Sequence, residues 1–559
     1  MTRRPMPTRL TAFLISCLCV LGGQSRADES ICVHAPSAAC LGKLAAQHAK
    51  ALARSETWWA ITRNLVLAGR ADDAKALAGN LSDPWHKSSL EETTAIAEVA
   101  TNARANPVLA ASLEPILGLS DFSISKERTL SRYDRISGSY HLLALELLGE
   151  QPYARSGKPW LVDAEKAHAG RNPPLPNATL QVVLKVWPEI IDKTSAWKRR
   201  GDWINLANAY SIARQFEEAR RVLQSLDQEE PRPGWSWRLV RAWLRAGDPD
   251  KALAAAVKEI DVERRANNLA EIASAYRSLG RTADALSTID LGFASLGDKP
   301  SGTGAVAAFV ALLQEQHRVG DVAGAARRAE ELARIAEQPH ILRPFNLARA
   351  AAMLNDLKQF ADARDLLERA VAALPPADRV VGHGFHMGPI RYNRSGLGGE
   401  AIQLIAVALY RSGESGRAVE LIRQAEPLYR MRACVDVIRN QLADSNSPFD
   451  PAALAEAIEP EYAAELLLVA SALKVEEGDI GGARMLFERA LEARWQSDSA
   501  RASGLGGDFV RVAALLGEQA LVVRSLHLSL KHALAIGDAD RRTLHVTSLA
   551  GMARGILPR

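Results

Sequence analysis

The sequence predicts an all-α solenoid of stacked helical hairpins, and two observations carry that prediction. Aromatic residues make up only 6% of the 559 residues, and small side chains let paired helices approach closely. A glycine followed five residues later by an alanine recurs, with an amphipathic helical pattern on either side, at Gly247 and Ala252, Gly280 and Ala285, Gly320 and Ala325, Gly413 and Ala418, and Gly478 and Ala483. A hairpin of this size cannot bury its apolar face alone, so each must stack on a neighbour.

The first 27 residues have the pattern of a secretory signal peptide. Three arginines precede a short apolar run from Leu10 to Gly23, and Ser25 and Ala27 supply the small residues of a cleavage site. The run is shorter than the roughly 20 residues that a membrane-spanning helix needs. We therefore predict a periplasmic or secreted bacterial protein without a transmembrane segment after cleavage. A lipobox match ending at Cys17 leaves a lipid anchor open as the alternative.

The net charge and the cysteines limit the kinds of partner and site that the chain can have. The formal net charge of +4 becomes zero without residues 1–27, which hold four arginines and no acid, and a neutral chain argues against nucleic-acid binding. Cys32 and Cys40 flank a short loop near the predicted mature N-terminus, where an exported protein forms a disulfide. A metal site there would need more ligands. Cys434 lies in an apolar helical run and is predicted to be buried.

The most regular repeats lie between residues 200 and 376. Their first unit contains, in order, Trp203, Ala207, Tyr210, Phe216, Ala219, Leu223 and Pro231. Arg214 stands in the position of the turn glycine, Gly247 and Gly280 follow at successive intervals of 33 residues, and Lys358 takes the glycine position of a later unit. This series resembles the tetratricopeptide repeat. The resemblance implies a right-handed superhelix whose concave groove, lined by the first helix of each repeat, binds a protein or extended peptide.

Composition divides the chain into seven segments. They are a signal peptide (1–27), a Cys-pair N-terminal segment (28–57), degenerate helical hairpins (58–164), a Pro-rich connector (165–199), the repeat core (200–376), a Gly/His-rich loop (377–399) and C-terminal helical repeats (400–559).

Polar residues at helical spacing on the first helices of three successive units form the candidate partner-binding set. The set consists of Asn205, Asn208, Arg238, Arg241, Glu271, Ser274 and Arg277. Amides hydrogen-bond an extended backbone and arginine forks onto a carboxylate, so these side chains suit a peptide with acidic groups. A polar face that is merely solvated has the same composition.

The Gly/His-rich loop is the second candidate site. His383, His386, Arg391 and Arg394 lie within residues 381–400, and a similar Ser-Gly spelling precedes helical runs at 301–305 and 503–508. Such a segment caps a helix start or holds an anion on exposed amides. Glu400 and Asp508 at the helix starts favour capping. Two histidines define no zinc geometry, so we predict no metal and no cofactor.

Signatures of enzymes are sparse. The sequence contains no GxSxG, HExxH or GxxxxGK[ST] motif, and the SxxK matches at Ser123 and Ser195 lack a companion KTG element. The sequence thus predicts a non-catalytic periplasmic scaffold or adaptor that binds an envelope protein or extended peptide in its groove. The alternative is an envelope enzyme or accessory subunit with a ligand site at 381–400.

Overall fold

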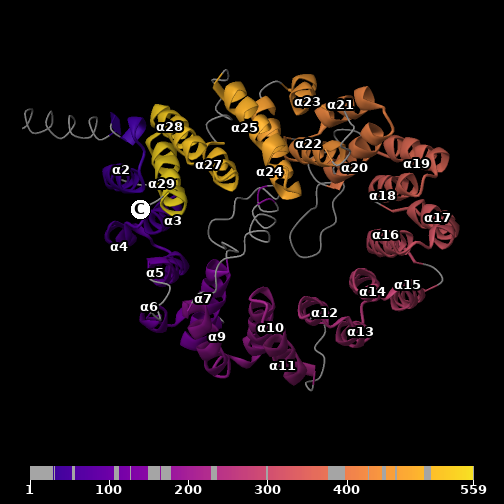
Figure 1. Cartoon of the computed structure of the whole chain (residues 1–559), viewed down its shortest axis with the longest axis horizontal. Coiled ribbons are helices and arrows are strands. Elements are labelled where there is room, and N and C mark those ends of the chain that lie inside the picture. The colour runs from indigo at the N-terminus through magenta and orange to yellow at the C-terminus, as the bar shows by residue number, and fades with distance from the viewer. Residues whose placement is uncertain are drawn as a thin grey trace, which may run out of the picture. The chain divides into compact units, whose positions relative to one another are not determined.

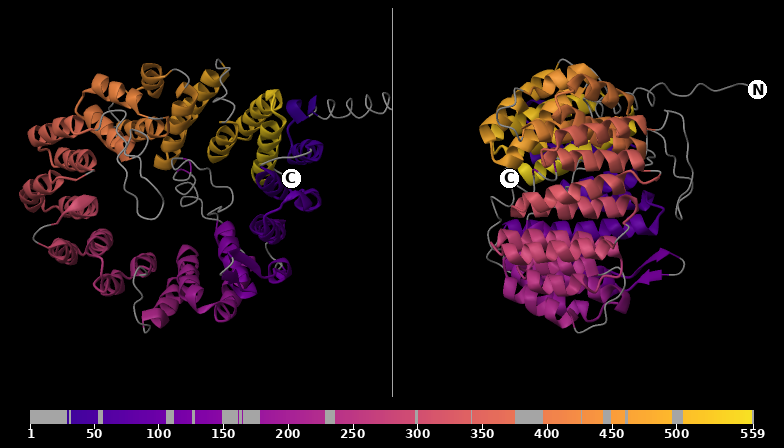
Figure 2. Two further views of the ribbon diagram at one scale, coloured as in Figure 1. Left: turned by 180° about the vertical axis from the view of Figure 1, so that it is seen from behind. Right: turned by 90° about the vertical axis from the view of Figure 1, so that its right-hand side faces the viewer.

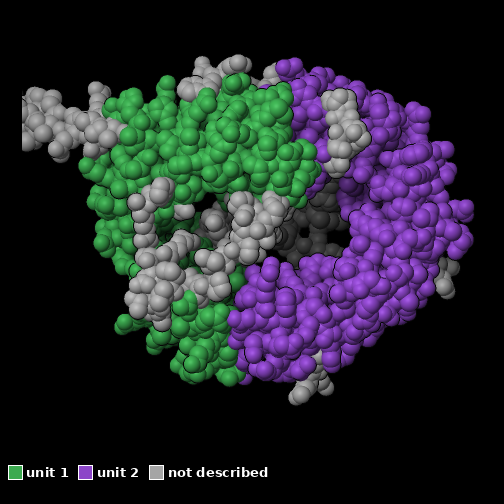
Figure 3. All heavy atoms as spheres, in the orientation of Figure 1, with its two compact units in different colours: residues 1–195, 471–559 green, residues 196–470 purple. Residues whose placement is uncertain are grey.

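The computed structural model describes residues 29–557 apart from 31, 53–56, 106–111, 126–127, 149–160, 162–163, 165–177, 228–235, 298–299, 341, 375–396, 426, 443–448, 460–461 and 496–504. The chain divides into two compact units, coloured in Figure 3. Unit 1 comprises residues 1–195 and 471–559, and unit 2 comprises residues 196–470. The predicted C-terminal repeat segment therefore belongs partly to each unit.

Unit 2 is a succession of helical hairpins, so the predicted fold class is confirmed. Its helices are α10 (Ala196–Ile212), α11 (Phe216–Asp227), α12 (Ser236–Arg245), α13 (Pro249–Ala256), α14 (Val262–Ser278), α15 (Thr282–Leu296), α16 (Gly302–Val319), α17 (Val322–Ala336), α18 (Arg343–Asp356), α19 (Phe360–Ala372), α20 (Leu397–Arg411), α21 (Ser415–Gln424), α22 (Pro427–Leu442) and α23 (Pro451–Ile458). The first helices of neighbouring hairpins contact one another from α10 to α22. They form a layer on the inner side of the curve of unit 2, and the second helices lie on its outer side (Figures 1 and 2).

Each hairpin turn from that between α10 and α11 to that between α20 and α21 contains a residue in the left-handed conformation. Gly247 and Gly280 both have φ of 73°, and Arg214 and Lys358 have φ of 59° and 61° at the equivalent positions. Among the described residues these two are the only non-glycine residues with positive φ. The next amide donates back into the helix end, as from Asp248 to the Trp243 carbonyl at 3.0 Å, which satisfies an otherwise unpaired carbonyl. The assignment of Arg214 and Lys358 to glycine positions is confirmed.

Arg214→Gly and Lys358→Gly are each expected to stabilise unit 2 by about 0.5–1 kcal/mol, because an L-residue is strained in this conformation by slightly more than glycine loses in entropy. Both side chains are exposed. Urea denaturation followed by circular dichroism measures the change. Gly280→Ala is the opposite control: a Cβ there meets no atom within 4 Å, so its expected cost of about 1–2 kcal/mol is purely conformational. An unchanged midpoint for both glycine variants would contradict the expectation.

The alanine that follows each turn packs inside the stack. Ala252, Ala285, Ala325 and Ala418 are all fully buried. In the hairpins α10 to α15 such alanines share one continuous core cluster with the buried Trp243 and Tyr276. Alanine at the contact lets the large ring of a first helix lie against a second helix, which explains why the two residue types recur together in the sequence.

Unit 1 joins the two ends of the chain. Its elements are α2 (Ala38–Ala51), α3 (Trp58–Leu67), α4 (Ala71–Leu77), η1 (Ala78–Asn80), α5 (Pro84–Ala105), α6 (Glu114–Leu117), β1 (Phe122–Ser125), β2 (Arg128–Leu130), α7 (Arg132–Leu147), α9 (Ala178–Ile191), α25 (Ile480–Trp495), α27 (Gly506–Leu515), α28 (Gln519–Ala535) and α29 (Ala539–Ile556), while α24 (Ala463–Glu477) crosses the boundary. Helix α29 packs against both α2 and α3 (Figure 1). Asn64 Nδ2 donates to Thr547 Oγ1 across this contact at 3.4 Å, and a Cβ on Gly551 would lie only 3.2 Å from Leu67 Cβ.

Cys32 and Cys40 form a disulfide, as predicted for this pair in an exported protein. Cys40 lies in the first turn of α2, and its amide donates to Oγ of the capping residue Ser37 at 3.2 Å. The disulfide therefore anchors the residues before α2 to a helix that packs on α29.

One predicted segment of unit 1 needs correction. The Pro-rich connector was assigned to 165–199, but residues 178–191 form α9, whose buried Leu180, Val183, Leu184 and Trp187 follow helical spacing and pack it on α7. Unit 1 also contains the short antiparallel pair β1 and β2, which leaves the fold predominantly helical. The alternation of apolar and polar residues in Phe-Ser-Ile-Ser favours a short strand there.

Candidate partner-binding face

The seven residues of the candidate partner-binding set all lie on α10, α12 and α14. We call the solvent-facing side of these three helices the first-helix face. Asn205 and Asn208 on α10 are half-buried, whereas Arg238 and Arg241 on α12 are exposed. Oδ1 of Asn208 is buried and accepts no hydrogen bond from the described residues. A buried amide oxygen without a donor is costly.

Ion pairs connect neighbouring first helices across this face. Arg241 donates from Nε to Glu271 Oε2 at 3.1 Å and from Nη2 to Oε1 at 2.6 Å, which is a two-pronged contact between α12 and α14. Arg277 of α14 donates from Nε to Glu315 Oε2 of α16 at 3.0 Å and from Nη2 to Ser274 Oγ at 3.2 Å. The hydrogen bonds with Glu271 raise the pKa of the Arg241 guanidinium. Four of the seven predicted residues thus contact other charged or polar groups of the same face.

Trp237 supports the arginines of α12. The guanidinium carbons of Arg238 and Arg241 each lie 5.4 Å from the centre of its ring, within reach of a cation–π attraction. Trp237 and Glu315 were absent from the predicted set. Aligning the units on their turn glycines would have placed Glu315 in the unit next to that of Arg277. Only the packing of α14 on α16 shows that the two side chains are in contact.

A carboxylate of the chain itself occupies the helix start at 301–305. Glu263 of α14 accepts a hydrogen bond from the backbone of Ala305, and a Cβ at Gly304 would lie 1.6 Å from Glu263 Oε2. Burial, followed by the nearby Asp261, raises the pKa of this carboxyl despite that bond. A side chain at residue 304 would have to displace the Glu263 carboxylate from this position, and the helix dipole favours a negative charge there. Ser301, the N-cap residue of α16, makes no side-chain capping hydrogen bond, so the carboxylate of Glu263 and not the predicted serine lies at this helix start.

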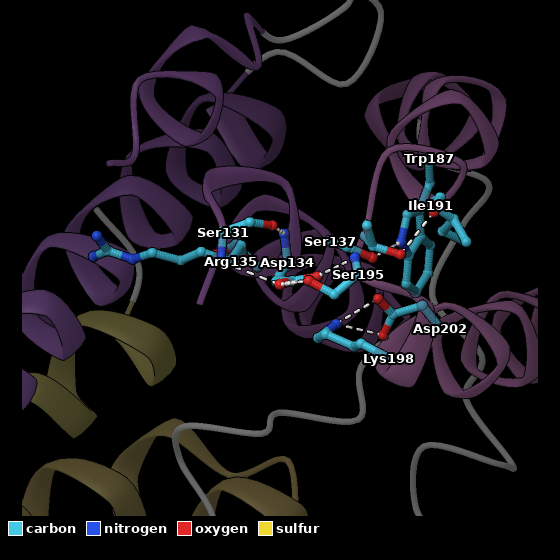
Figure 4. Close-up of polar contacts among 11 residues, drawn as sticks. Ser131, Asp134, Arg135, Ser137, Trp187, Ile191, Ser195, Lys198 and Asp202 are labelled. Carbon is cyan, nitrogen blue, oxygen red and sulfur yellow. Dashed lines mark hydrogen bonds and ion pairs between the residues drawn. The ribbon is translucent and has the colours of Figure 1, made fainter. Parts of the chain in front are cut away.

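The SxxK match at Ser195 belongs to a structural contact. Ser195 Oγ donates to Asp134 Oδ2, and its backbone amide donates to Asp134 Oδ1 at 2.7 Å (Figure 4). Lys198 Nζ contacts both carboxylate oxygens of Asp202, one turn along its own helix. The Ser195 hydroxyl and the Lys198 ammonium are each bonded to a different buried carboxylate. The match at Ser123 begins in β1, and its Lys126 lies outside the described residues.

The remaining sequence predictions concern the Gly/His-rich loop, Cys434, metal sites and membrane-spanning helices. His383, His386, Arg391 and Arg394 lie outside the described residues. Cys434 is buried in α22, and burial raises the pKa of its thiol to about 12. The described ranges contain no group of three or more His, Cys, Asp or Glu side chains arranged to hold a metal ion. None of the helices described is both long and apolar enough to cross a bilayer.

Comparisons with known proteins add little to this geometry. No protein-family model matches the chain, and no curated protein sequence matches it. Among solved structures, Ton1535 from Thermococcus onnurineus NA1 is similar with a TM-score of 0.21 and 12% identity, over 76% of this chain and 97% of that one. The complex of Naa15 and Naa10 bound to HypK-THB is similar with a TM-score of 0.21 and 12% identity, over 88% of this chain and 68% of that one. At these TM-scores neither similarity supports a conclusion.

Proposed function

We propose that this protein is a non-catalytic scaffold that binds a protein partner, or an extended segment of one, on the first-helix face of unit 2. The observation that carries the proposal is the continuous layer of first helices on the inner side of unit 2, with exposed arginines, half-buried amides and Trp237 at its surface. Stacked helical repeats present extended concave surfaces of this kind to their partners. Tryptophan and arginine are also the residues that most often dominate binding energy at protein interfaces.

We further propose that the protein works in the bacterial envelope or is secreted. Its support is the signal-like pattern of residues 1–27 together with the Cys32–Cys40 disulfide, because structural disulfides persist in oxidising compartments. N-terminal sequencing of the protein from fractionated cells tests this. A start at Asp28 in the periplasmic fraction agrees with the proposal, a lipid-modified Cys17 would support the anchored alternative, and an uncleaved cytoplasmic chain would contradict both.

Site-specific photo-crosslinking in living cells tests the binding face. A crosslinking amino acid at Ser274, on α14, is expected to capture a discrete protein, and the yield should fall when Arg238 and Arg241 are both changed to glutamate. The matched control places the same amino acid at Ser287, which is exposed on the second helix α15 of that hairpin. Equal capture from both positions, or no discrete product from Ser274, would overturn the proposed face.

A further inference from the structure

We propose that the first-helix face of unit 2 recognises an acidic segment of its partner, with Glu271 as the internal carboxylate that this segment displaces. The inference rests on the proposed function and names the chemistry of the partner. It starts from a division of charge between the two helix layers. Helices α10, α12 and α14 together carry nine Lys or Arg residues and three Asp or Glu residues. Helices α11, α13 and α15 together carry three Lys or Arg residues and six Asp or Glu residues. The excess of basic over acidic residues on the first helices remains when the buried Arg200 and Asp202 are left out.

The centre of the basic excess is α12. It carries Arg238, Arg241 and Arg245, all three exposed, and no acidic residue. The ring of Trp237 lies beneath two of these guanidinium groups, which restricts their freedom before any partner arrives. A concentrated positive potential on an otherwise neutral chain attracts anionic groups to this face and speeds their association.

The contacts already present on the face indicate that its anions are carboxylates. Arg241 holds Glu271 through two parallel hydrogen bonds, which is the geometry that arginine uses for a carboxylate from any source. The side chains of this pair are 52% and 39% exposed, and exposed pairs contribute only about 0–1 kcal/mol. A partner carboxylate can therefore replace Glu271 at little cost. The acids on the face also repel the closely spaced phosphates of a nucleic acid.

The helix spacing predicts how the acidic groups are distributed. Packed helices lie about 8–10 Å apart, and an extended chain advances about 3.3 Å per residue. A peptide that crosses α12 and α14 therefore presents an acid to Arg241 and to Arg277 when its acidic residues are about three positions apart. A run of adjacent acids fits this spacing less well.

Fluorescence anisotropy with the purified protein tests the inference. The probe is a labelled peptide of four Ser-Ser-Glu repeats, and its partner probe has glutamine in place of glutamate. We expect the glutamate probe to bind at least tenfold more tightly than the glutamine probe. Binding should fall at least tenfold in Arg238→Gln with Arg241→Gln, which removes both charges without adding an acid beside Glu271. Glu271→Gln should tighten binding about threefold or more, because it removes the competitor.

The matched control is Arg221→Gln with Lys251→Gln, an equal change of charge on the second helices α11 and α13. Both residues are exposed, and binding to this variant should stay within twofold of the unmodified protein. An equal loss in the control would show a general charge effect and overturn the inference. Equal binding of the two probes, or no binding of the glutamate probe, would also overturn it, while the proposed function would still be decided by crosslinking at Ser274. Displacement of the probe by lower concentrations of a single-stranded oligonucleotide or of phosphatidylglycerol vesicles would assign the face to another class of anion. Circular dichroism confirms that each variant is folded.

Discussion

Trp243→Ala is expected to lower the free energy of unfolding of unit 2 by about 3–5 kcal/mol, the usual cost of removing a fully buried tryptophan. The side chain is 0% exposed and lies in the core cluster that runs through the hairpins α10 to α15. Because each hairpin of a solenoid depends on its neighbours, the loss should be greatest in the adjacent helices. Hydrogen exchange measured by mass spectrometry should show faster exchange in α12 and α14 and unchanged exchange in unit 1.

Trp243→Phe separates packing from hydrogen bonding at this position. The indole Nε1 is buried and has no acceptor among the described residues, so the smaller ring loses volume but no hydrogen bond. We expect a cost of about 1–2 kcal/mol, well below that of alanine. If phenylalanine costs as much as alanine, the tryptophan acts through a polar contact and the packing explanation fails.

Asp134→Ala is expected to destabilise unit 1 by about 2–3 kcal/mol, because it removes a buried carboxylate and leaves its half-buried donors without a partner. Asp134 is 1% exposed and accepts from the Ser195 amide, the Ser195 hydroxyl and the Ser131 amide. These bonds hold the start of α7 to Ser195, in the turn after α9 (Figure 4). Faster hydrogen exchange in α7 and α9 would report the loss. Ser195→Ala, which removes one donor and keeps the carboxylate, should cost about 1 kcal/mol.

The same carboxylate makes the stability of unit 1 sensitive to acid. Burial alone would raise the pKa of Asp134, but the hydrogen bonds from Ser195 and Ser131 together lower it below its ordinary value of 3.8. The unfolded chain then binds the proton more readily than the folded one, so the contribution is complete above the unfolded pKa and is lost as pH falls through the folded pKa. Asp134→Asn should remove this dependence, so its difference from the unmodified protein should shrink as pH falls below about 4. A difference that stays constant with pH would contradict this explanation.

The candidate binding face was predicted in part. The sequence placed Asn208, Arg241 and Glu271 on the first helices of successive units, because the turn glycines register one unit on the next. It did not predict that Arg241 and Glu271 contact each other. That contact joins residues 30 positions apart and depends on the rotation and spacing of neighbouring hairpins, which the residues of one hairpin do not encode.

What the sequence determined by itself is local. The helical hairpins, the left-handed turns at Arg214 and Lys358, and the Cys32–Cys40 disulfide each depend on residues close together in the chain, where backbone sterics and loop length decide the outcome. Only the tertiary structure placed α29 against α2 and α3 and buried α9 in unit 1. The Thr57–Asp540 hydrogen bond of that first contact joins residues 483 positions apart. No periodic pattern records such a pairing, because the apolar face of α29 fits any helix of similar shape and only the packing of the whole unit selects its neighbours.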